Sequence, residues 1–158
     1  MSETDQQIAI DTCISLLKSG SRVQIKMSGN SMFPFIKNGE TCIIEPIENI
    51  EELKMGDVLV FGNQKKMIAH RLVSIRELND KTFFYCRGDS RMKPDSAIPS
   101  ENILGKAIAI IKKGKEIRIE ALPGNLTLVK LSRYLIPFYY TYWGVRNLFC
   151  KRHPRFLL

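Results

Sequence analysis

The sequence has few of the residues that bind metals or form disulfides. Its four cysteines are scattered without a CxxC pair, and only two histidines accompany them. Paired spacing is typical of zinc sites and of disulfide frameworks, so neither is expected here. We therefore predict free, buried thiols, a reducing compartment, and a protein that uses no metal and no other cofactor.

Long apolar runs are absent as well. No stretch offers the roughly 18 uncharged apolar residues that a membrane-spanning helix needs. The first residues of the chain include two acids and lack the basic region followed by an apolar region of a secretory signal. The sequence accordingly predicts a cytoplasmic protein without a membrane anchor.

Acidic residues are missing from 121–158, which holds six lysines and arginines and many aromatic side chains. We expect this basic aromatic C-terminal extension to be helical. It suits an anionic membrane surface, which would place the protein peripherally at the inner face of the membrane. Packing of this helix on the rest of the chain is an equal alternative. Nucleic acid is a weaker one, because the charges cluster beyond the aromatic residues.

The remaining pattern predicts two further parts. Residues 1–20 contain an amphipathic helix, since apolar side chains recur at helical spacing over 5–18 and Gly20 follows. Residues 21–120 contain short strand-like runs separated by turn signals. These runs are 22–27, 41–45, 57–62, 67–75, 81–87, 103–111 and 116–120. The predicted fold class is mostly β, with a rolled, barrel-like antiparallel sheet.

One turn within the predicted sheet carries a candidate nucleophile. Ser31 follows Gly29 and Asn30, and Pro34 stiffens the chain after it. Glycine, asparagine and serine also form ordinary turns for backbone reasons, which is the simpler interpretation. A catalytic serine would need a base to remove its proton and backbone N–H groups to receive the oxyanion.

A candidate base lies in a strand-like run. His70 is the only histidine in 21–120, and it alternates with Ile68 and Leu72 on one strand face. A histidine there could simply be a core or surface residue with a satisfied hydrogen bond. Alternatively, a strand would hold a general base rigidly, and histidine titrates near neutral pH.

Two candidate acids follow in a polar loop. Asp89 and Asp95 lie in "RGDSRMKPD", where Gly88 and Pro94 also allow both to be turn residues. A carboxylate beside His70 would fix the tautomer of the imidazole and stabilise its protonated form. The pattern itself does not decide which of the two reaches His70.

Taken in order, "SGNSMFP", "MGDVLVF", "IAHRLV", "YCRGDSRMKPD" and "ILGKAIAI" resemble the signal peptidase superfamily, which also contains the self-cleaving repressor proteases. The resemblance runs over about residues 23–111. It implies a signal-peptidase-like rolled sheet and a serine endopeptidase. Because a histidine and not a lysine fills the position of the base, the chain resembles the Ser/His branch.

The resemblance also implies roles for individual residues. Ser31 would be the nucleophile and His70 the general base. Asp89 and Asp95 would be assisting acids, with Asp89 the stronger candidate because it occupies the Gly-Asp position itself. The Ser31 backbone amide would contribute to the oxyanion hole, with Ser28 as a candidate helper.

The chain departs from the family pattern in ways that narrow the function. We expect no membrane anchor of the kind that ordinary signal peptidases carry, and "GDSRMKPD" replaces the Asn-rich box of the eukaryotic enzymes. Repressor-type self-cleavage is not expected, because 1–20 is too short for a DNA-binding domain and neither Ala-Gly nor Cys-Gly occurs.

The remaining interpretation is a stand-alone peptidase that cuts a peptide or protein precursor. Its substrate would be, for example, a leader peptide with Ala, Gly or Ser before the scissile bond, as the resemblance implies. The alternative is a non-catalytic module with the same fold that binds an extended peptide by strand addition.

Overall fold

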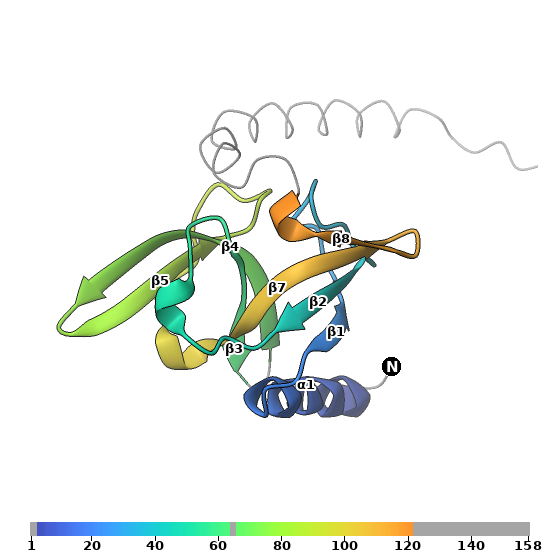
Figure 1. Cartoon of the computed structure of the whole chain (residues 1–158), viewed down its shortest axis with the longest axis horizontal. Helices are drawn as coiled ribbons and strands as arrows, with labels where there is room; N and C mark the ends of the chain where they lie inside the picture. The colour runs from blue at the N-terminus through green and yellow to red at the C-terminus, as the bar shows by residue number, and fades with distance from the viewer. Residues whose placement is uncertain (1–2, 64–65, 122–158) are drawn as a thin grey trace, which may run out of the picture.

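The computed structural model of the chain describes residues 3–63 and 66–121 (Figure 1). These residues form a curled antiparallel sheet of eight strands, shaped as a half-barrel, and one α-helix. The mostly β, rolled antiparallel fold and the N-terminal helix are thus confirmed. The predicted C-terminal helix lies outside the described residues, apart from Ala121.

The described part of the chain contains one α-helix, eight strands and three short 3₁₀-helices. The helix α1 spans Glu3–Lys18. The strands are β1 Val23–Lys26, β2 Thr41–Glu45, β3 Val58–Asn63, β4 Lys66–Leu78, β5 Lys81–Arg87, β6 Ile98–Pro99, β7 Ile103–Lys112 and β8 Lys115–Arg118. Three single turns of 3₁₀-helix, η1 Ile50–Glu52, η2 Ser100–Asn102 and η3 Ile119–Ala121, complete the described part.

The sheet is continuous, and every neighbouring pair of strands is antiparallel. Its order is β1-β2-β7-β3-β4-β5-β6, and β8 pairs with the end of β7. The long strand β4 changes partner along its length: Lys66–Arg71 pairs with β3, whereas Arg71–Leu78 pairs with β5. As a result, the β4–β5 hairpin projects from the body of the molecule (Figure 1).

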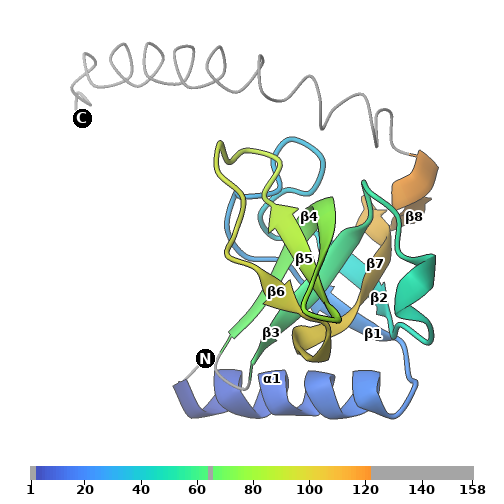
Figure 2. The same ribbon diagram turned by 90° about the vertical axis from the view of Figure 1, so that its left-hand side faces the viewer.

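Two clusters of buried side chains form the core. The first includes Leu17 of α1 and residues of β1, β2, β3 and β7. The second lies inside the curl of β3, β4, β5 and β6, and its fully buried members include Leu59, Leu72 and Phe84. The helix crosses one end of the sheet, and the loops 28–40 and 88–97 lie together at the opposite end (Figure 2).

The described cysteines are free thiols. Cys42 and Cys86 are buried, and Cys13 is half-buried. Burial raises the pKa of the Cys42 and Cys86 thiols to about 12, with smaller contributions from Glu40 and Asp95 respectively. Such thiols stay protonated and unreactive at neutral pH. The fourth cysteine, Cys150, lies outside the described residues.

Within residues 3–63 and 66–121, no helix combines the length and the apolar character needed to cross a bilayer.

Candidate active site

Ser31 lies on a loop that the core holds at both ends. The loop leaves β1 and returns to β2. Two backbone hydrogen bonds close its base, because the Met27 N–H donates to the Glu40 carbonyl and the Gly39 N–H donates to the Met27 carbonyl. The next residue after the serine, Met32, is buried, and so is Ile36 one turn further on. The loop is thereby anchored in the first core cluster, and Ser31 itself stays partly exposed.

The loop brings the serine to the histidine. Ser31 Oγ lies 3.0 Å from His70 Nε2, although the two residues are 39 positions apart in the sequence. His70 is buried on β4 at 5% exposure, and the Phe61 ring packs edge-on at 6.2 Å between ring centroids. The distance allows a hydrogen bond from the hydroxyl to the imidazole.

An acid completes the row on the other side of the imidazole. His70 Nδ1 lies 2.6 Å from Asp95 Oδ2. The Asp95 backbone N–H donates to the Cys86 carbonyl at 2.8 Å, which fixes the acid beside the end of β5. With a proton on Nδ1 donated to the carboxylate, the lone pair of Nε2 faces the Ser31 hydroxyl. This is the arrangement of a Ser-His-Asp triad.

Asp89 has a different partner. Its two carboxylate oxygens accept hydrogen bonds from Arg71 Nε at 2.7 Å and from Arg71 Nη2 at 2.8 Å. The predicted ranking of Asp89 above Asp95 as the partner of His70 is therefore reversed in the structure. The reason is the register of the sheet: Arg87 pairs with Arg71, so the Gly-Asp dipeptide that follows β5 meets Arg71 and not His70.

Arg71, which carried no predicted role, joins three segments around the site. Besides Asp89, its guanidinium donates to the Gly56 carbonyl at 2.8 Å and lies 5.8 Å from the centroid of the Phe35 ring. Arg71 is only 4% exposed. The sequence signal for this role was an arginine directly after a candidate base, in a strand-like run, with two aspartates to choose from for one histidine, because a buried charge requires a partner.

The loop after β5 is also hydrogen-bonded directly to the serine loop. The Ser90 backbone N–H and its Oγ both donate to the Ser31 carbonyl, at 2.9 and 3.0 Å. Gly88 makes this approach feasible: a Cβ atom there would lie 2.7 Å from the Ser31 carbonyl oxygen and 3.1 Å from His70 Nε2. A side chain at position 88 would clash with the Ser31 carbonyl oxygen and crowd the His70 ring.

The predicted oxyanion donors are only partly defined by the structure. Among the described residues, the Ser31 backbone N–H has no acceptor, and an N–H of this kind could serve an oxyanion. Ser28 is exposed on the same loop, and its role as a helper stays a prediction.

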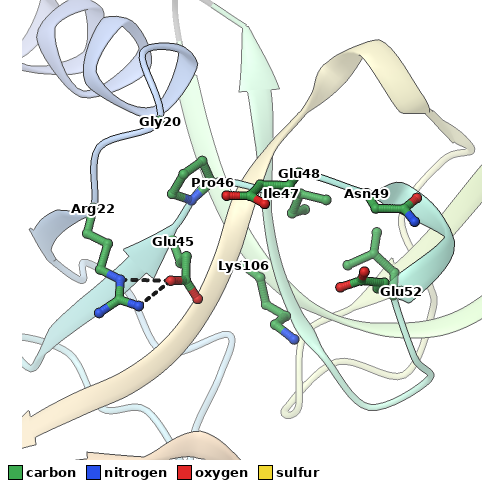
Figure 3. Close-up of a pocket in the computed structure, with 10 residues that line it drawn as sticks. Gly20, Arg22, Glu45, Pro46, Ile47, Glu48, Asn49, Glu52 and Lys106 are labelled. Atoms are coloured by element: carbon green, nitrogen blue, oxygen red, sulfur yellow. Dashed lines mark hydrogen bonds and ion pairs between the residues drawn. The ribbon is translucent and has the colours of Figure 1, made fainter.

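A separate surface pocket lies away from these residues (Figure 3). It has a volume of about 330 Å³ and is lined by residues of the α1–β1 connection, β2, η1 and β7. Two of its charges have partners: Arg22 bonds to Glu45, and Lys106 lies 3.6 Å from Asp57. The pocket contains none of the candidate catalytic residues, so we assign it no part in the chemistry.

Comparison with known proteins finds a relative that is a signal peptidase by name. No family model and no solved structure matches the chain. The chain is 31% identical over 86 residues to Signal peptidase I W of Bacillus subtilis (strain 168). The match covers 53% of this chain and 45% of the relative, so the chain spans less than half the length of that protein. This similarity supports a signal-peptidase-like relationship.

Proposed function

We propose that the protein is a serine endopeptidase of the Ser/His branch of signal peptidases, with Ser31 as nucleophile, His70 as general base and Asp95 as the assisting acid. The observation that carries the proposal is the row of contacts from Ser31 Oγ to His70 Nε2 at 3.0 Å and from His70 Nδ1 to Asp95 Oδ2 at 2.6 Å. The similarity to a signal peptidase supports it independently.

The chemistry follows from the positions of these atoms. Ser31 Oγ attacks the scissile carbonyl while His70 Nε2 takes the hydroxyl proton. Asp95 stabilises the resulting imidazolium, and the Ser31 N–H donates to the oxyanion. His70 then gives the proton to the leaving amine. Water, activated in turn by His70, hydrolyses the acyl-enzyme and restores the serine.

An open strand edge beside His70 offers a place for the substrate. Over Lys66–His70, β4 pairs with β3 on one edge, and among the described residues no strand pairs with its other edge. An extended peptide can add to such an edge through backbone hydrogen bonds. The edge ends at the histidine, so a peptide bound there leads to the Ser31 hydroxyl.

The substrate we propose is a peptide or protein precursor, such as a leader peptide, with a small residue before the scissile bond. Contact of 121–158 with an anionic membrane surface stays a prediction from composition, because that segment lies outside the described residues.

The test is single-turnover cleavage of a peptide library with Ala, Gly or Ser before the scissile bond. We expect Ser31→Ala and His70→Ala each to lose several orders of magnitude in rate, and the double variant to be scarcely slower, because the residues act as a unit. Ser15→Ala, at an exposed serine of α1, is the matched control and should keep wild-type activity.

One outcome would replace the proposal. If the wild-type protein cleaves no peptide, while wild type and both single variants bind peptides equally well, the site is a peptide-binding module without catalysis.

A further inference from the structure

We infer that a second pocket, beside Asp95, is a subsite for an apolar side chain of the peptide substrate. The inference rests on the proposed peptide-binding function. The pocket has a volume of about 320 Å³. Phe61 and Gly62 of β3 and Ile68 of β4 form one side, and residues 95–99 with Asn102 form the other. We call it the acid-side pocket.

The acid-side pocket is continuous with the catalytic row. Asp95 belongs to both, since it bonds to His70 and also lines the pocket. The Phe61 ring contacts the pocket and packs against the His70 ring. Ile68 precedes His70 by two residues and lies on the same strand face. Two residues of a strand span about 7 Å, so an occupant would lie within about three residues of the scissile bond.

The lining selects the chemical class of the occupant. Apart from Asp95, the residues that line the pocket are uncharged, and most of them are apolar. The carboxylate already bonds to His70, and no described cation lines the pocket to attract an acidic group. At about the lower limit of ordinary ligand pockets (roughly 300 Å³), the volume suits a single side chain.

The open edge of β4 supplies the direction of approach. Residues directly opposite each other on paired strands place their side chains on the same face of the sheet. A peptide added along Lys66–His70 therefore presents alternate side chains on the face of Ile68, and the one opposite Ile68 points to the acid-side pocket. Neighbouring residues of the peptide point away from it.

The experiment fills the pocket from its exposed side. Ala97 lines the pocket and is exposed, so Ala97→Trp should fold normally. Lys93→Trp, at an exposed residue of the same loop that does not line the pocket, is the matched control. Peptides carry Gly, Ala, Leu or Phe at each of three positions on either side of the scissile bond, and kcat/KM is measured for each.

We expect one position at which wild type prefers Leu or Phe over Gly by about 10- to 200-fold, the usual range for an apolar pocket. Ala97→Trp should remove most of that preference, whereas Lys93→Trp should keep it. A flat wild-type profile, or an Ala97→Trp variant that slows all peptides alike, would overturn the subsite.

Binding measurements separate this inference from the proposed catalysis. Fluorescent Leu and Gly peptides are titrated against Ser31→Ala, with and without Ala97→Trp. Selective binding that Ala97→Trp abolishes, in a protein whose wild type cleaves nothing, would support the subsite and contradict the peptidase. Cleavage without any Leu preference in rate or binding would contradict the subsite alone.

Discussion

Asp89 and Asp95 lie on one loop but in different surroundings. The Asp95 side chain is 28% exposed and contacts His70, whereas the Asp89 side chain is 10% exposed and contacts Arg71 through both oxygens. The first acid can hold the imidazole of His70 in a fixed orientation. The second neutralises a buried guanidinium, so its contribution is to the folded state and to the position of the loop.

We predict that substitution of these acids separates activity from stability. Asp95→Asn should lower kcat by about 10⁴-fold, as the loss of the acid does in other triads, and change the free energy of unfolding little. Asp89→Asn should lower that free energy by about 3–5 kcal/mol, because it leaves Arg71 buried and uncompensated. Peptide cleavage and urea unfolding measure the two effects.

The control for the buried pair removes both charges. Arg71→Met combined with Asp89→Leu should be more stable than Asp89→Asn, since no isolated charge remains. A stable but inactive Asp89→Asn variant, with Asp95→Asn fully active, would instead assign the catalytic acid to Asp89.

At the scale of the elements, the two faces of α1 differ in burial. Leu17 is 2% exposed and belongs to the first core cluster, whereas Ile8 on the same helix is 60% exposed. Both are large aliphatic residues, so they form a matched pair that differs in burial.

We predict that Leu17→Ala lowers the free energy of unfolding by about 2–5 kcal/mol, the usual range for a truncated core leucine. Ile8→Ala should change it by no more than about 0.5 kcal/mol, because little surface is exposed by the change. Urea denaturation followed by circular dichroism measures both. Equal effects would show that α1 does not dock on the sheet in solution.

Elements with strong local patterns were predictable from the sequence, and those set by tertiary contacts were not. The runs 41–45 and 81–87 coincide with β2 and β5, since their β-branched and aromatic residues and the flanking turns are local signals. The run 67–75 ends before β4 does, because the projecting hairpin is open to solvent and has lost its alternation. The two-residue strand β6 has no pattern that could reveal it.

The residues of the candidate site also fall into those with a local sequence signal and those that depend on tertiary contacts. Ser31 and His70 were predictable, because each is the suitable residue type in a recognisable motif. Which aspartate contacts His70 was not predictable, because sequence separation does not specify the register of the strands. A bulge between Leu72 and Ser74 shifts the pairing of β4 with β5, and it is this pairing that places Asp89 on Arg71.

At the scale of the whole molecule, two buried thiols link stability to pH. Folding raises the pKa of Cys42 and of Cys86 to about 12, well above the ordinary value of about 8.5. The folded state therefore retains protons that the unfolded chain loses as the pH rises. The stabilisation is complete below about pH 8.5 and is lost progressively between about pH 9 and 12.

We predict that the free energy of unfolding falls over this range, by up to about 1.4 kcal/mol per pH unit for each thiol. Urea unfolding at pH 7, 9 and 10.5 measures the slope. Cys86→Ala should be less stable at pH 7 but show a shallower decline, and the comparison cancels the titration of lysines and tyrosines. Parallel slopes for variant and wild type would contradict the assignment.

The absence of a side chain at Gly88 bears on how related genomes should be searched. Because a Cβ atom there would lie 2.7 Å from the Ser31 carbonyl oxygen, a homologue with any other residue at this place cannot keep the serine and the histidine in the present geometry. Sequences that retain the serine and the histidine but have lost this glycine are then candidates for decayed or repurposed copies. The residue that aligns with Gly88 would identify these sequences before any of the proteins is produced.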